Sequence, residues 1–261
     1  MSVIEITGLS KSYDNKVKAV DDLSLTIPGG MVFGILGPNG AGKSTIMNIL
    51  AGIITRSGGE IRVLGEPIEK GDYEYKKQVG FVLEKPHYIK KLTVEEYLNF
   101  CGAMYGIEAG GVGNRIAELL AFLDLLEARG HLIENLSKGM KKKVALAAAL
   151  IHRPRLLLLD EPLEGIDPVS SKIIKDNLKQ MTRKEMSVVI SSHNLDTVEK
   201  FCDEVAIIDK GKRVFQEKTA NIREVIKNDE TGETFESLEE VFVTLISNNR
   251  NDESKKLSWL Q

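Results

Sequence analysis

The chain has 261 residues, of which 42% are hydrophobic and 28% are charged, and its formal net charge is -3. This length fits one large domain, or one domain with a sizeable insertion, and can bury a core without disulfide or metal staples. The near-neutral charge argues against a chain that wraps nucleic acid, because such domains are usually strongly basic.

The apolar runs are too short to cross a membrane. The longest, residues 144–151, falls well below the roughly 20 residues that span a bilayer. The first ten residues include Glu5 and no basic segment, so we expect no secretory signal. Cys101 and Cys202 are far apart and lack metal-ligand spacing, which is typical of reduced thiols. We therefore expect a cytoplasmic protein.

The N-terminal part of the chain is expected to be rich in strands. Residues 3–9 and 23–27 alternate apolar and polar side chains, which predicts half-buried antiparallel strands. A Pro-Gly-Gly turn then precedes a continuous apolar run of strand length. The pattern that follows predicts a strand at 31–36, a helix at 44–52, and strands at 60–64 and 79–83.

The middle of the chain changes to a helical pattern. Residues 93–137 predict a helical insertion, with glycine breaks expected around Gly106 and at 110–113. Apolar strand-type runs then return at 156–159, 188–190 and 205–208, with helical segments between them. This alternation favours a parallel sheet covered by helices on both faces.

The C-terminal part predicts one more helix. Ser237 and Glu240 have the spacing of a capping box, and apolar residues from Leu238 to Ile246 follow on one helical face. Beyond Ser247 the sequence is polar, and we expect a loose end.

Residues 37–44 read Gly-Pro-Asn-Gly-Ala-Gly-Lys-Ser and fit the pattern G-x-x-x-x-G-K-[ST] between a predicted strand and a predicted helix. Glycines let the backbone wrap closely around an anion, so that successive N–H groups point inward. Lys43 adds a full charge for the β- and γ-phosphates, and the hydroxyl of Ser44 suits Mg²⁺. The predicted nucleotide-binding residues are Gly37, Pro38, Asn39, Gly40, Ala41, Gly42, Lys43, Ser44 and Thr45.

Two acids, Asp160 and Glu161, end the apolar run at 156–159. In open parallel sheets the chemistry lies beyond the carboxyl ends of the strands. We expect Asp160 to reach the Mg²⁺ shell, and Glu161 to orient or deprotonate a water for attack on the γ-phosphate.

With these motifs, the sequence resembles the ATP-binding subunit of ABC transporters over nearly its whole length. Residues 135–140, Asn-Leu-Ser-Lys-Gly-Met, resemble the signature loop of that family, usually LSGGQ. Ser137 and Gly139 match the pattern, whereas Lys138 and Met140 depart from it. The resemblance implies that Ser137 caps a helix whose N–H groups face the γ-phosphate bound on a second subunit.

Four further positions gain a role from the resemblance. His193, after Ser191-Ser192, resembles the switch histidine that contacts the γ-phosphate. Asp167 resembles the D-loop aspartate at the subunit interface, and Tyr13 the aromatic ring that stacks on adenine. Glu84 stands where the family normally has a glutamine that touches Mg²⁺ and the attacking water. The metal ligands implied are Ser44, Glu84 and Asp160.

The resemblance also implies the architecture. It predicts an α/β fold: a P-loop NTPase core with a mixed, mainly parallel sheet, an N-terminal antiparallel β subdomain and a helical insertion. Residues 1–227 would form the ABC ATPase domain, with the helical subdomain at about 88–150, and 228–261 a C-terminal helical extension and loose tail. A run of lysines is expected to form a solvated face: Lys138, Lys141, Lys142 and Lys143.

The function implied is an ATP-binding and ATP-hydrolysing subunit that drives transport through separate polytopic membrane subunits at the inner face of the cell membrane. Its ligands would be ATP and Mg²⁺, and its partner a second ATP-binding subunit, with a homodimer favoured. Glu84 and residues 237–243 look like the ABC-2 type branch of drug and peptide exporters, and export is favoured by resemblance alone.

Two other functions compete with this interpretation. A soluble ABC ATPase could act on ribosomes or nucleic acid, but those branches carry two phosphate loops or a long coiled coil, and the sequence has neither. A P-loop kinase or GTPase would leave Ser137, Gly139 and His193 unexplained, and no guanine-reading N-K-x-D follows a strand.

Overall fold

The computed structural model describes residues 1–14, 17–69, 71, 73–222 and 237–248. From residue 249 onward, the loose end expected beyond Ser247 lies outside the described residues. No helix in the described part of the chain is both long and apolar enough to span a lipid bilayer.

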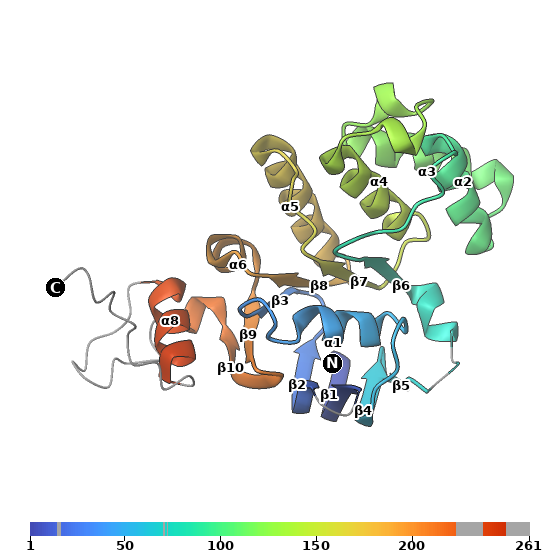
Figure 1. The fold of residues 1–261 in the computed structure, drawn as a ribbon. Coiled ribbons are helices and arrows are strands. Elements are labelled where there is room, and N and C mark those ends of the chain that lie inside the picture. The colour runs from blue at the N-terminus through green and yellow to red at the C-terminus, as the bar shows by residue number, and fades with distance from the viewer. Residues whose placement is uncertain (15–16, 70, 72, 223–236, 249–261) are drawn as a thin grey trace.

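The strands form two sheets (Figure 1). The smaller sheet is antiparallel and has the order β2-β1-β4-β5. Its strands are β1 (Ser2–Tyr13), β2 (Val17–Pro28), β4 (Gly58–Val63) and β5 (Glu66–Pro67). This sheet confirms the antiparallel pairing that the alternating N-terminal sequence predicts.

The larger, six-stranded sheet has the order β10-β9-β3-β8-β7-β6. All neighbouring strands in it are parallel except β9 and β10, which are antiparallel. Its strands are β3 (Val32–Leu36), β6 (Val79–Val82), β7 (Leu156–Asp160), β8 (Ser187–Ser192), β9 (Glu204–Asp209) and β10 (Lys212–Lys218). The mixed, mainly parallel sheet is therefore confirmed.

Helices cover both faces of this sheet, and α2 to α5 stand together on one side of it in Figure 1. The α-helices are α1 (Lys43–Leu50), α2 (Val94–Met104), α3 (Ala109–Phe122), α4 (Lys138–Leu150), α5 (Pro168–Thr182), α6 (Leu195–Phe201) and α8 (Leu238–Asn248). Short 3₁₀ turns lie at Glu74–Gln78, Leu126–Ala128, Ile133–Asn135 and Thr219–Asn221.

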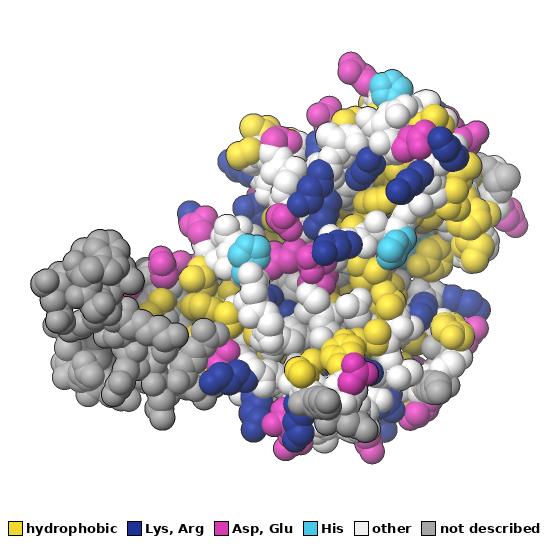
Figure 2. Space-filling model, in the orientation of Figure 1, with side chains coloured by type: hydrophobic (Ala, Val, Ile, Leu, Met, Phe, Trp, Pro, Cys, Tyr) yellow, Lys and Arg dark blue, Asp and Glu magenta, His cyan; other side chains and the backbone are white. Residues whose placement is uncertain are grey.

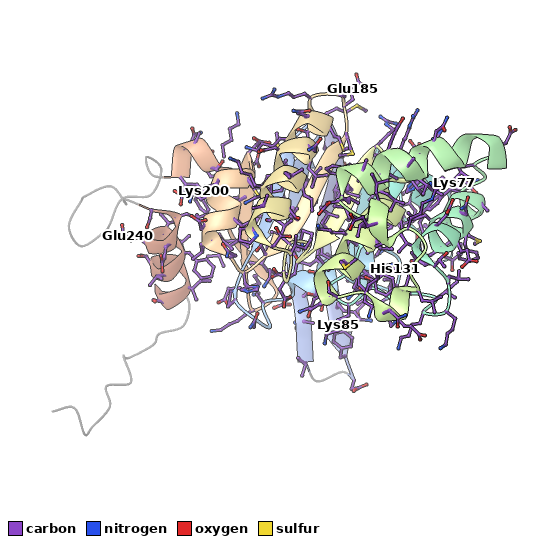
Figure 3. All side chains as sticks on the ribbon, turned by 90° about the horizontal axis from the view of Figure 1, so that it is seen from above. Lys77, Lys85, His131, Glu185, Lys200 and Glu240 are labelled. Carbon is purple, nitrogen blue, oxygen red and sulfur yellow. The ribbon has the colours of Figure 1, made fainter. Side chains whose placement is uncertain are left out.

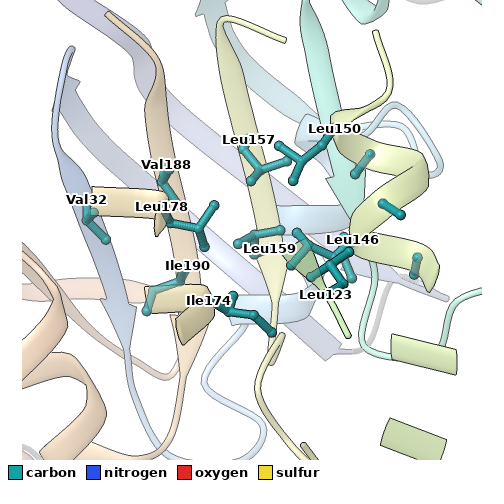
Figure 4. Close-up of a cluster of buried hydrophobic side chains, with 14 of the residues drawn as sticks. Val32, Leu123, Leu146, Leu150, Leu157, Leu159, Ile174, Leu178, Val188 and Ile190 are labelled. Carbon is teal, nitrogen blue, oxygen red and sulfur yellow. The ribbon is translucent and has the colours of Figure 1, made fainter. Parts of the chain in front are cut away.

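The alternation of side chains along each buried strand divides the core into two clusters. Leu157 and Leu159 of β7 belong to the cluster beneath α4 and α5, and Leu156 and Leu158 belong to the cluster shared by the two sheets and α1. Figure 4 shows the first cluster, where side chains of α4 and α5 meet those of the strands. Because all four leucines are buried, β7 is held from both faces and its carboxyl end is fixed in place.

The glycine break expected at residues 110–113 is wrong. Gly110, Gly111 and Gly113 lie within the first turns of α3. Farther along the same helix, Ile116 and Leu120 are fully buried, and this packing outweighs the low helix propensity of glycine. The other expected break is present, since Gly106 has φ 73° just after the end of α2.

The helix predicted near the C-terminus is present as α8. The Glu240 N–H donates a hydrogen bond to the Ser237 hydroxyl at 3.3 Å, which is one half of the expected capping box. Leu238 and Val241 are buried in the same cluster as residues of α6.

We predict that Leu178→Ala, on the buried face of α5, lowers the free energy of unfolding by about 2–5 kcal/mol, because it leaves a cavity against the sheet. Urea unfolding followed by circular dichroism measures the change. Val169→Ala on the same helix, where the side chain is exposed, should cost less than about 0.5 kcal/mol. Equal losses in the two variants would contradict the assigned packing of α5.

Candidate functional site

The site begins at the loop between β3 and α1, where two glycines are required by close approaches. A Cβ at Gly37 would lie 2.2 Å from the carbonyl oxygen of Ile208. A Cβ at Gly42 would lie 2.4 Å from the carbonyl oxygen of Ala19, and its φ of 106° is one that other residues rarely adopt. The loop is therefore pressed against β2 and β9, and its N–H groups lead into the N-terminus of α1.

Lys43 lies folded back over this loop. Its ammonium donates hydrogen bonds to the carbonyl oxygens of Gly37 at 2.7 Å and Pro38 at 3.1 Å, and the residue is only 7% exposed. Burial lowers the pKa of the Lys43 ammonium, and the nearby carboxylates of Glu161, Asp160 and Glu84 act in the opposite direction. The group is a cation facing acids, which suits it to bridge bound phosphate oxygens.

Asp160 is the buried carboxylate of the site, at 2% exposure. It accepts a hydrogen bond from the Ser191 hydroxyl of β8 and one from the Ser44 hydroxyl at 3.4 Å. A hydroxyl and a carboxylate are oxygen donors of the kind that Mg²⁺ prefers. Within the described residues, no cluster of three or more His, Cys, Asp or Glu is suited to a metal ion.

Glu161 stands at the mouth of the same strand end. Its Oε1 lies 2.7 Å from Nδ1 of His193, and the Ser192 hydroxyl lies 3.5 Å from Oε2. The carboxylate side chain is 14% exposed, so it is largely shielded but still reachable by water. A carboxylate held by a histidine in this way can accept a proton or orient a water molecule.

These groups share one edge because the strands are parallel. Gly37 and His193 directly follow β3 and β8, and Asp160 is the last residue of β7. These three strands lie side by side in the sheet. Seen from above, Lys85, which follows β6, and Glu185, which precedes β8, lie at opposite edges of the molecule (Figure 3). The carboxyl ends therefore open at the edge where Lys85 lies.

The structure places the predicted signature residues Ser137 and Gly139 at the start of α4, away from the phosphate loop. Ser137 caps α4 by accepting a hydrogen bond from the Met140 N–H at 3.2 Å. A Cβ at Gly139 would lie 2.6 Å from the carbonyl oxygen of Gly165, so this turn packs against the segment that leads to Asp167. Asp167 caps α5 through the Ser170 N–H, and this hydrogen bond lowers the pKa of its carboxyl group. Within the described ranges, no hydrogen bond or ion pair joins Ser137, Gly139 or Asp167 to residues 37–45.

The side chains of Tyr13 and Glu84 are exposed to solvent. The Tyr13 side chain is 43% exposed at the end of β1, with the Lys11 ammonium 5.2 Å from its ring centroid. Glu84 lies two residues beyond β6, and its charge opposes part of the lowering of the Lys43 pKa that burial causes.

The expectation that four lysines form a solvated face is wrong for two of them. Lys142 and Lys143 are buried, at 3% and 6% exposure, and the Lys142 ammonium donates a hydrogen bond to the backbone carbonyl of Glu161. Lys141 is half-buried and donates to the carbonyl of Glu134 at 2.9 Å, whereas Lys138 is exposed and pairs with Glu164 at 2.8 Å. Helix spacing gives no sequence signal for this difference, because the half-buried Lys141 also precedes a buried residue, Ala145, by four positions.

On the face shown in Figure 2, Lys and Arg side chains gather over the helices above the sheet, next to a group of acidic side chains at the centre.

Comparison with known proteins gives one family. The family model described as "ABC transporter" matches residues 20–164. The linearmycin resistance ATP-binding protein LnrL of Bacillus subtilis is 38% identical over 212 residues, which cover 81% of this chain and 68% of LnrL. The Nod factor export ATP-binding protein I of Rhizobium sp. (strain N33) is 34% identical over 81% of this chain and 69% of its own length.

A solved structure titled as the ATP-binding subunit of an ABC transporter has a TM-score of 0.84 and 28% identity, and the match covers 94% of this chain and 99% of that one. This likeness extends over both sheets and the helical insertion, and it confirms the predicted fold class of a P-loop NTPase core.

We predict that Lys138→Ala raises the pKa of Glu164. The hydrogen bond and charge of Lys138 lower that pKa in the folded protein, as do the more distant charges of Lys142 and His193. A lowered folded pKa stabilises the protein above the pKa of the unfolded carboxyl, and this contribution is lost as the pH falls through the folded value. A ¹³C NMR titration of the carboxyl carbon measures the shift. Lys200→Ala, which breaks the exposed pair with Asp196, should leave Glu164 unchanged, and an unchanged pKa in Lys138→Ala would refute the pairing.

Proposed function

The chain belongs to the ABC transporter family of ATP-binding proteins, and we propose that it hydrolyses ATP at the Lys43–Asp160–Glu161 site to drive transport through separate membrane subunits. The observation that carries the proposal is the pairing of a shielded Glu161 carboxylate with His193 at the strand edge that also holds the phosphate loop. The chain spans about two thirds of the two relatives described above, and their activities and substrates enter here as support.

ATP binding would use the loop that precedes α1. The N–H groups of the loop and the N-terminus of α1 would surround the β- and γ-phosphates, while Lys43 exchanges its carbonyl partners for phosphate oxygens. Ser44 and Asp160 would hold Mg²⁺, with Glu84 beside them, and the cation would neutralise charge on the phosphates. The exposed ring of Tyr13 is available to stack on adenine.

In the hydrolytic step Glu161 would orient a water and accept its proton as the water oxygen attacks the γ-phosphorus. The bond from the γ-phosphorus to the bridging oxygen breaks, and ADP leaves with that electron pair. His193, 2.7 Å from the carboxylate, would hold it and contact the γ-phosphate. Lys43 stabilises the negative charge that develops on the phosphate oxygens.

A second ATP-binding subunit would complete each site. Ser137 is exposed at the start of α4, so the N-terminus of this helix can meet a phosphate that arrives from another molecule. We propose a homodimer in which Ser137 and Gly139 of one copy face the γ-phosphate of the other, with Asp167 at the interface. Because this clamp needs the γ-phosphate, ADP should not support it.

The membrane partner would dock on the helical insertion. Apolar side chains are exposed on α2 and on the residues that flank it: Ile89, Phe100, Met104 and Tyr105. An exposed apolar group of this kind marks an interaction surface. We propose that it receives cytoplasmic helices of a polytopic membrane protein at the inner face of the cell membrane. The names of the two relatives, which mention linearmycin resistance and Nod factor export, support export as the direction.

The proposed division of the chain follows the same roles. Residues 1–227 would form the ATPase domain, residues at about 88–150 its docking subdomain, and residues 228–261 an extension. The described helices α2 to α4 fall mainly within the proposed subdomain.

We predict that Glu161→Gln lowers kcat for ATP hydrolysis by at least about 100-fold, because glutamine cannot accept the proton. ATP binding should persist, and an ATP-bound dimer should accumulate. Size-exclusion chromatography with light scattering, in ATP and Mg²⁺, measures the dimer, and crosslinking serves as a control for weak association.

Lys43→Ala should abolish hydrolysis and form no dimer. Full activity in Lys43→Ala would reject the assignment of the phosphate loop.

We predict that Phe100→Glu combined with Met104→Glu reduces co-purification with the proposed polytopic membrane partner by about tenfold, or roughly 1.4 kcal/mol. Charges on the proposed docking surface would have to lose water to enter the contact. Ile53→Glu, at an exposed apolar position after α1, should leave co-purification intact. Equal recovery of the partner with both proteins would show that docking occurs elsewhere.

A further inference from the structure

The backbone at Glu161 has an unusual conformation. Its φ is 46°, in the left-handed region that costs a residue with a Cβ about 1–2 kcal/mol. The neighbouring strand secures the turn from one side, because the Glu161 N–H donates to the Ser191 carbonyl at 3.2 Å. A conformation of this kind persists only where surrounding groups hold it.

The other side of the turn is held by Lys142. This residue projects from α4, and its ammonium donates a hydrogen bond to the Glu161 carbonyl oxygen. The same peptide segment is therefore held at its N–H by β8 and at its C=O by α4.

The burial of Lys142 is costly, which argues for a specific contact. The residue is 3% exposed, and burial lowers the pKa of its ammonium. The charges that face it are the carboxylates of Asp160 at the end of β7 and of Glu161 and Glu164 just after it, together with Lys138 on its own helix. A charge-assisted hydrogen bond to a carbonyl offsets part of the cost of removing the ammonium from water.

We propose that Lys142 is a positioning residue that holds the Glu161 turn from α4 and so aims the carboxylate at the attacking water. The proposal rests on the role of Glu161 given under Proposed function. Because Ser137 begins the same helix, α4 would carry both the phosphate-facing cap for the partner subunit and the support of the base in its own subunit. A shift of α4 on dimer closure would then change the aim of Glu161, which links the two nucleotide sites.

Steady-state ATP hydrolysis by the full chain tests the proposal. Lys142→Met keeps the length of the apolar stem but removes the donor, and we expect kcat to fall about 10- to 100-fold, since small misplacements of a catalytic group have effects of this size. The KM for ATP and the affinity for a fluorescent ATP analogue should stay within about threefold, because the phosphate loop is untouched. Lys142→Arg restores a cationic donor and should recover most of kcat.

Lys141→Met is the matched control. It removes an ammonium-to-carbonyl hydrogen bond from the same helix, at Glu134, and should leave kcat within about twofold of the wild type. If Lys142→Met does not fold, Lys142→Gln takes its place: its shorter amide should lower kcat at unchanged KM.

Three results would overturn the proposal. The first is a wild-type kcat in the folded Lys142 variants. The second is a loss in Lys142→Met that Lys142→Arg does not reverse and that is matched by lost ATP affinity, which would mark a merely structural lysine. The third concerns the premise: if Glu161→Gln hydrolyses ATP normally, Glu161 is not the base and the proposed function is wrong as well. If Glu161→Gln is inactive while Lys142→Met is fully active, only the positioning role of Lys142 is wrong.

Discussion

The site depends on one buried carboxylate. Asp160 ends β7 in the interior of the protein, and a lone anion there would be costly unless hydrogen bonds satisfied it. The hydroxyls of Ser44 and Ser191 do so, and they come from the helix after β3 and from β8. The contact thus joins three segments that are far apart in the sequence, and it fixes the phosphate loop relative to Glu161. The parallel register, with Asp160 opposite Ser191, makes the contact possible.

Much of this arrangement follows from local sequence patterns. The apolar runs predict the buried strands because parallel strands covered on both faces need no polar side chains. The phosphate loop is recognisable because the requirement for glycine at Gly37 and Gly42 is local: each lies where a Cβ would strike a neighbouring carbonyl. The charge of Lys43 and the acids after β7 are equally plain in the sequence.

Other features depend on tertiary packing and have no local signature. The left-handed turn at Glu161 arises from contacts with β8 and α4, so the residue type alone does not predict this backbone conformation. Gly110 and Gly111 enter a helix because distant apolar residues anchor it. From their charge alone, Lys142 and Lys143 are predicted to be exposed, but the packing of α4 buries both of them. Ser137 and Gly139 lie at the start of α4, and no hydrogen bond within the described residues joins them to the phosphate loop.

The close approach of Gly139 to Gly165 bears on how this segment can diverge. A methyl group at residue 139 would collide with a backbone carbonyl, which cannot turn aside as a flexible side chain could. Its neighbours meet no such barrier: Lys138 extends outward toward Glu164, and Met140 is only half-buried. The two departures from the signature pattern therefore stand on either side of this close contact, and the retained glycine lies at the contact itself.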